Sequence, residues 1–337
     1  MKKKSKFPDP APAKVKLTEK RSTKRVIKAV SIIVLITIVL FTATPFIAIP
    51  VLVNRHVNYK GYETTDYPLQ GIYKATDFGL SEKQMYLKTE DGLNIWCSEI
   101  YTRQPKALII YLTGIMQPSV TYFYGHAKYM QEQGYASILL EVRGHGNSEG
   151  SRICLGYEEA YDVKAAVKYV KSQEKYKNVP IVLHGVSMGG AISINSFGQI
   201  LDIDALIAMS AYSSFEDVVI DLAEKYPIPK FLGKLEKPLI RSALKTVFGS
   251  RQVDEMKPVE QIKNSNGRPV LLIACTEDAN VPAASLLRLK EANPSINIWL
   301  RNSWEHFIIK DCDFRNVRQD TEYWNVILEF LNQAFPD

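Results

Sequence analysis

Apolar runs and longer polar stretches alternate regularly over the last three quarters of the chain. Two strand-like segments, residues 83–89 and 93–101, are separated by Asp91-Gly92, a pair typical of hairpin turns. Short apolar runs then follow at 107–112, 136–142, 180–183, 205–209, 269–274 and 296–300. Helical stretches lie between them, near 119–133, 156–175, 188–200, 282–292 and 319–333. This pattern predicts an α/β fold with a mostly parallel sheet that helices cover on both faces.

The alternation is interrupted once, between residues 214 and 266. The fifty or so residues there look helical and moderately amphipathic, and so long a connection within a compact domain is usually functional. We therefore predict a helical lid at about 214–266. Its apolar positions, such as Ile240, Leu244 and Phe248, either contact a lipophilic substrate or pack against the lid's own domain.

An apolar segment of a different kind precedes the sheet. Residues 29–53 contain no charge, and as a helix they would reach about 37 Å, enough for a hydrocarbon core of roughly 30 Å. A buried core helix would carry a polar stripe, and a cleaved signal peptide would have a shorter apolar run and a small-residue exit. We predict an uncleaved transmembrane signal anchor at 29–53. Pro45 and Pro50 should end its helix near Thr44 or bend it there.

The net charge of +6 over 337 residues would by itself suggest nucleic acid or an anionic surface as a partner. However, residues 1–28 hold eleven Lys or Arg and two acids, so this tail carries +9 and the rest of the chain −3. Basic residues beside a membrane span stay on the cytoplasmic side. We therefore predict a basic cytoplasmic tail at 1–28, everything after residue 53 on the exocytoplasmic side, and lipid rather than nucleic acid as the partner of the tail.

Residues 54–81 show no sustained periodicity and are predicted to be a juxtamembrane linker, which leaves 82–337 as the folded domain. The four cysteines, Cys97, Cys154, Cys275 and Cys312, are too sparse for a disulfide scaffold. No spacing of Cys, His or carboxylates supports a metal site. We expect free buried thiols, although a pair could bridge in an oxidising compartment.

The sharpest chemical signal is GVSMGG at residues 185–190, directly after a predicted strand and before a predicted helix. This is a G-x-S-x-G nucleophile elbow in the strand-turn-helix context that it requires. A tight turn must lift Ser187 above the sheet, and glycines on either side avoid collisions with neighbouring backbone. The sequence therefore predicts Ser187 as a nucleophile.

A serine hydroxyl needs a base and a group that orients the base. The chain order for this elbow is Ser, acid, His. His306 is the only histidine after Ser187, so we predict that it is the base. Asp278 follows the strand at 269–274, at the strand end where α/β folds place sites, and is the predicted acid. Glu277 and Asp217 remain alternative acids.

An oxyanion requires two N–H donors, usually one from the residue after the nucleophile and one from the loop after the third strand. Met188 occupies the first position. Ile115, in Thr113-Gly114-Ile115-Met116, is the predicted second donor, and Met116 is the alternative.

With these residues in place, the segment from about 82 to 335 resembles the α/β-hydrolase fold superfamily, in its serine-hydrolase branch. EVRGHGNSEG at 141–150 resembles the D-x-R-G-x-G-x-S turn of that family, and the approach to Asp278 is also similar. Two departures are Thr113-Gly114 and Cys275-Thr276, where the family often has His-Gly. Glu141, which leads the turn, is expected to anchor loops, His145 to be structural, and His184 to pack beneath the elbow.

The resemblance implies a serine hydrolase that cleaves acyl esters through an acyl-enzyme and needs no cofactor, and the predicted anchor at 29–53 would attach it to a membrane. The lid and the anchor favour a small-molecule or lipid acyl ester as substrate. Two alternatives stay open: a peptidase or amidase of the aminopeptidase-like type, and a non-catalytic, membrane-tethered binding module that has kept the fold. The sequence does not indicate the oligomeric state.

Overall fold

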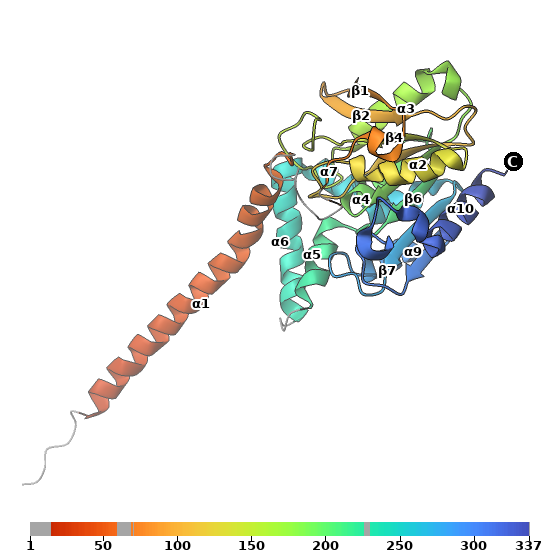
Figure 1. The fold of residues 1–337 in the computed structure, drawn as a ribbon. Helices are drawn as coiled ribbons and strands as arrows, with labels where there is room; N and C mark the ends of the chain where they lie inside the picture. Colours follow the sequence, from red (N-terminus) through yellow and green to blue (C-terminus); the bar gives the residue numbers. More distant parts are fainter. Residues whose placement is uncertain (1–14, 59–68, 70, 226–229, 337) are drawn as a thin grey trace, which may run out of the picture. The chain divides into compact units, whose positions relative to one another are not determined.

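The computed structural model describes residues 15–58, 69, 71–225 and 230–336, and Figure 1 follows the chain through them. They fall into two units, the first ending at Ile47 and the second beginning at Ala48. Residues 1–14 of the predicted tail, and 59–68 and 70 of the predicted linker, lie outside the described residues.

The first helix, α1, runs from Val15 to Val53. Its segment Lys24–Val53 has a mean hydropathy of 2.7 and is, within the described part of the chain, the one helix long and apolar enough to cross a membrane by length and composition. The helix does not end at Thr44, so the first of the two alternatives, an end there, was wrong, whereas a bend there stays a prediction. Pro45 and Pro50 each remove a single backbone hydrogen bond, and the apolar residues around them continue the helix.

The described residues from 83 onwards form an eight-stranded sheet of order β1-β2-β4-β3-β5-β6-β7-β8. The strands are β1 (Lys83–Lys88), β2 (Asn94–Ile100), β3 (Leu108–Leu112), β4 (Ala136–Leu140), β5 (Ile181–Val186), β6 (Ala205–Met209), β7 (Val270–Cys275) and β8 (Asn297–Arg301). β2 pairs antiparallel with β1 and with β4, and the other neighbours are parallel. The predicted hairpin followed by a parallel sheet is therefore confirmed.

Both faces of the sheet are buried, as the uninterrupted apolar strands predict. In β3, for example, Leu108, Ile110 and Leu112 belong to one core cluster, whereas Ile109 and Tyr111 belong to the other. The first cluster includes α3 (Ala160–Ser172), α4 (Met188–Gln199) and α9 (Ala284–Ala292), and the second includes α2 (Tyr124–Glu132) and α10 (Thr321–Ala334).

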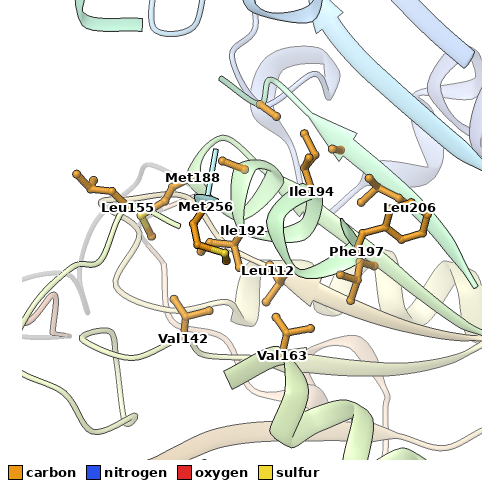
Figure 2. Packing of buried hydrophobic residues seen from close by; sticks show 14 of the residues in the cluster. Leu112, Val142, Leu155, Val163, Met188, Ile192, Ile194, Phe197, Leu206 and Met256 are labelled. Atoms are coloured by element: carbon orange, nitrogen blue, oxygen red, sulfur yellow. The ribbon is translucent and has the colours of Figure 1, made fainter. Parts of the chain in front are cut away.

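Figure 2 shows the first cluster, with side chains of α4 lying among those of β3, β6 and α3. Met188, Ile192 and Phe197 of α4 are fully buried there. Because the helix that follows Ser187 is so firmly packed, its N-terminus is fixed relative to the strand ends.

The predicted lid region is helical, with α5 (Phe215–Ala223), α6 (Lys230–Phe248), α7 (Ser250–Glu255) and α8 (Pro258–Gln261) between β6 and β7. Ile240, Leu244 and Phe248 of α6 are at most 5% exposed and belong to the first core cluster. Of the two interpretations of these apolar positions, packing against the lid's own domain is therefore the one that the structure supports.

Candidate active site

Ser187 lies in the turn between β5 and α4. The strand β5 continues to Val186, three residues beyond the predicted run, so the nucleophile candidate follows it directly. Ser187 has φ 58° and ψ −120°, a region that non-glycine residues rarely adopt. Its N–H donates to Met209 O at 2.8 Å, which helps to hold the strained turn against β6.

The flanking positions must be glycine because a side chain there would collide with neighbouring atoms. A Cβ on Gly185 would lie 2.1 Å from Gly189 O, and one on Gly189 would lie 2.4 Å from Leu112 O. Both distances are far below van der Waals contact. The elbow can therefore approach the end of β3, where the Thr113–Met116 loop begins, only because position 189 has no side chain.

The structure brings Ser187, His306 and Asp278 into one hydrogen-bonded row. Ser187 Oγ lies 2.9 Å from His306 Nε2, and His306 Nδ1 lies 2.7 Å from Asp278 Oδ2. Ser187 and Asp278 are buried, and the His306 side chain is 12% exposed. This is the spacing that a nucleophile, a base and an orienting carboxylate require.

Backbone groups hold the carboxylate of Asp278. Its Oδ1 accepts from the N–H groups of Asn280 at 2.7 Å and Val281 at 3.0 Å. Burial raises the pKa of Asp278, but the hydrogen bond and charge of His306 and these two N–H groups outweigh burial, so the pKa lies below its ordinary value. The carboxylate therefore stays ionised beside the imidazole.

The two alternative acids lie elsewhere. Glu277 is exposed, with its N–H donating to Ser303 O. Asp217 accepts from Ser214 Oγ at 2.7 Å while its own N–H donates back to that hydroxyl, so it belongs to the N-terminal cap of α5. Of the three carboxylates, Asp278 is the one bonded to His306.

Of the two predicted oxyanion donors, Met188 is the first residue of α4 and Ile115 lies in the loop after β3. The backbone bonds of loops and caps in the described residues include none that is donated by the Ile115 N–H or the Met188 N–H. Thr113, where the family often has His, is buried and shares a hydrogen bond of 2.8 Å with the Tyr122 hydroxyl. This departure thus ties the start of the loop to the aromatic core.

The remaining motif residues have structural partners. Glu141 is fully buried and accepts from Ser119 Oγ at 2.7 Å and Asn147 N at 2.6 Å, so it links two loops as expected. His184 is buried and bonds Tyr323 Oη at 3.0 Å. Neither residue contacts Ser187 in the described hydrogen-bond network.

Two supporting residues could not be found by sequence reasoning. Arg301, on β8, donates to Ile308 O at 2.7 Å and forms a two-point ion pair with Asp320, which fixes the loop that carries His306. Lys225, just after α5, donates to Ala279 O at 2.8 Å and so ties the lid region to the Asp278 loop. Both are single basic residues without a local motif, and only the fold reveals their partners.

A mostly parallel sheet with an elbow after β5, an acid after β7 and a histidine after β8 is the arrangement of the α/β-hydrolase fold. The model of the family described as "Serine aminopeptidase, S33" matches residues 103–237. The chain therefore has the α/β-hydrolase fold, and the matched segment, less than half of the chain, is similar to this family.

Two curated proteins are similar to about half of the chain. The chain is 26% identical over 175 residues to the uncharacterized protein YqkD of Bacillus subtilis, covering 49% of this chain and 54% of that protein. It is 27% identical over 179 residues to the monoglyceride lipase of Rattus norvegicus, covering 45% and 59%. The chain thus spans little more than half the length of these relatives.

A solved structure shows the same fold. The Pyrococcus furiosus esterase Pf2001 superimposes with a TM-score of 0.59 at 21% identity, covering 79% of this chain and 95% of the esterase.

Proposed function

We propose that this chain is a membrane-anchored serine hydrolase that cleaves acyl esters. The observation that carries the proposal is the row Ser187–His306–Asp278, with hydrogen bonds of 2.9 and 2.7 Å. His306 takes the proton of Ser187 as the hydroxyl attacks the acyl carbonyl, and it then protonates the leaving group. Asp278 holds the imidazole in the required orientation and stabilises its charged form.

The developing oxyanion is bound by the N–H groups of Ile115 and Met188, which lie in the loop after β3 and at the N-terminus of α4. Water then attacks the acyl-enzyme, with His306 acting as base, and releases the acid. Each step uses only groups of this chain and water.

A lipid-like acyl ester is the substrate class that we favour. One relative is named as a monoglyceride lipase and a structural neighbour as an esterase. The apolar helix Lys24–Val53 would hold the domain at a membrane surface, where such substrates are concentrated. The buried apolar face of α6 does not contribute to this argument, because it packs within the domain.

The description of the matched family favours one second candidate, a serine peptidase or amidase. Ser187, His306 and Asp278 could also hydrolyse an amide bond through an acyl-enzyme of the same kind. The two candidates differ in the leaving group, so they are separated by substrates that share an acyl part.

The experiment uses the full-length protein in detergent micelles. Acyl esters of graded chain length are assayed beside aminoacyl amides, together with labelling by a fluorophosphonate. We expect ester turnover and labelling, both reduced at least about 1,000-fold in Ser187→Ala and unchanged in Ser172→Ala, an exposed serine of α3. Amide turnover without ester turnover would favour the peptidase, and absence of both activities and of labelling would favour a binding module.

We also propose that the tail at 1–28 is cytoplasmic and the catalytic domain exocytoplasmic, on the basis of the +9 charge of the tail. Protease added to sealed right-side-out vesicles should digest the domain and leave a tag at the N-terminus intact. Loss of the tag with retention of the domain would reverse the orientation.

A further inference from the structure

The loop after β4 carries His145, whose ring lies between two backbone carbonyl groups. Nε2 is 3.0 Å from Ile115 O, and Nδ1 is 3.1 Å from Arg143 O. The side chain is completely buried. Because a carbonyl oxygen only accepts, any hydrogen bond here must be donated by the ring.

Ile115 is the residue whose N–H is proposed to bind the oxyanion. Its carbonyl belongs to the next peptide group, so a donor on that oxygen restricts the rotation of the backbone on one side of the Ile115 Cα. Oxyanion donors contribute to catalysis only when they are already oriented before the transition state forms. A buried donor at Ile115 O therefore acts on the geometry of the hole.

The loop that carries His145 is itself fixed by the segment that follows α1. Val57 forms a β-bridge around His145: its N–H donates to Gly144 O at 2.8 Å, and its carbonyl accepts from Gly146 N at 2.7 Å. His56 adds ring contacts to Gly146 O at 2.9 Å and Gly150 O at 2.8 Å. Residues 56 and 57 thus brace the loop of His145.

The other end of the loop is held by charge. Arg143 forms a two-point ion pair with Asp91, and its N–H and its guanidinium both donate to Asp162. Arg143 O is therefore a fixed acceptor, and a neutral His145 ring, which has a single N–H, can donate either to it or to Ile115 O. The contact to Ile115 is the shorter of the two.

We propose that His145 is a positioning residue for the oxyanion hole, donating from Nε2 to Ile115 O while residues 56 and 57 brace its loop. The proposal rests on the proposed function, in that it assigns Ile115 to the hole. It does not make His145 a catalytic residue, because the ring touches the loop and not the reacting atoms.

Two isosteric variants separate the two ring contacts. The amide nitrogen of Gln lies near the place of a histidine Nε2, and that of Asn near the place of Nδ1. His145→Gln therefore keeps the donor to Ile115, whereas His145→Asn keeps only the donor to Arg143 O. Both variants place a neutral amide at the same buried position, so the cost of burying a polar side chain is similar in the two.

The test measures ester turnover and the rate of fluorophosphonate labelling for the full-length protein in detergent, with hydrogen exchange of peptides covering 113–117. In His145→Asn we expect kcat and the labelling rate to fall about 10- to 100-fold with KM little changed, and exchange at 113–117 to become faster. In His145→Gln we expect all three quantities to stay within about threefold of the starting protein.

Equal losses in the two variants would overturn the proposal, since the donor position would then not matter, and so would wild-type behaviour of His145→Asn. Thermal unfolding of both variants identifies a general loss of fold. If the starting protein neither turns over esters nor labels, the proposed function fails. Hydrogen exchange then still decides whether His145 orders the loop.

Discussion

Ser187 Oγ lies 2.9 Å from His306 Nε2, although 119 positions separate the two residues in the sequence. Ser187 follows β5 and His306 follows β8, and between these strands the parallel sheet contributes β6 and β7. The carboxyl ends of parallel strands meet at one edge of a sheet, which is where α/β folds assemble their sites. The contact therefore depends on the register of four strands.

Asp278→Asn tests the acid of this row. The amide has no charge to stabilise the imidazolium and can stabilise the wrong tautomer of His306, so kcat should fall about 10³- to 10⁴-fold with the fold retained. Steady-state ester kinetics of the full-length protein provide the measurement. The matched control is Glu277→Gln, the same chemical change at the exposed neighbouring position, which should stay near the starting rate. A large loss in the control with activity retained in Asp278→Asn would move the acid to Glu277.

The strands and Ser187 could be predicted because their signals are local, and His306 because it is the only histidine after Ser187. The apolar runs mark the strands, and GVSMGG marks the turn in which Ser187 adopts its strained backbone. Asp278 was preferred to Glu277 only because of its position in the loop. The structure adds a physical reason, because the N–H groups of Asn280 and Val281 donate to the Asp278 carboxylate and hold it in place.

The supporting contacts could not be predicted, because they join residues without a shared pattern. In the sequence His56 is a polar residue of the predicted juxtamembrane linker. In the structure its ring contacts the carbonyl groups of Gly146 and Gly150, about ninety positions further along the chain. The end of α1 was misplaced for a related reason. A proline removes one backbone hydrogen bond and favours a helix end or a kink, but here the helix continues through Pro45 and Pro50 to Val53.

Gly189→Ala tests the space between the elbow and β3. The added Cβ would lie 2.4 Å from Leu112 O and 2.5 Å from Thr113 O, and backbone at both positions cannot move without disturbing the sheet. We expect a loss of about 1–3 kcal/mol in the free energy of unfolding, measured with urea, and a loss of labelling at Ser187. Gly233→Ala in α6 is the control, since among the described residues its Cβ would meet the flexible Ile220 side chain, at 3.3 Å, and no backbone atom. Equal stability of the two variants would contradict the steric argument.

The buried thiols should react slowly with alkylating reagents. Cys97, Cys154 and Cys275 are free and buried, while the Cys312 side chain lies outside the described part of the chain. Burial raises the pKa of Cys97 to about 12 and that of Cys275 to about 11, so little reactive thiolate forms at pH 8. Mass spectrometry after iodoacetamide treatment should show these peptides unmodified in the native protein and modified in urea. Rapid native alkylation of Cys97 would contradict its burial, and lack of modification in urea without reductant would contradict its free state.

A buried histidine pair should make the fold sensitive to acid. His126 lies among Phe123, Phe314 and Trp324, 5.8 Å from the His184 ring, and neither of its nitrogens has a hydrogen-bond partner among the described residues. Burial lowers the pKa of His126 well below its usual value, with a further contribution from His184, and burial lowers the pKa of His184 to about 3.

The sign of the effect follows from proton uptake. Below about pH 6.5 the unfolded chain binds a proton at each histidine, whereas the folded protein does not until far lower pH. Stability should therefore fall as the pH drops from about 6.5 towards 3, by up to about 1.4 kcal/mol per pH unit for each histidine.

His126→Phe removes one of these two titrating groups and also an unpartnered polar ring in an aromatic cluster. Urea unfolding of the variant and the starting protein between pH 4 and 7 should show a stability difference in favour of the variant that grows as the pH falls. Comparing the two proteins at each pH cancels contributions from groups that they share, such as the buried Glu159, whose pKa burial raises to about 7. A difference that is constant across the range would show that His126 does not titrate on unfolding, and would contradict the assignment.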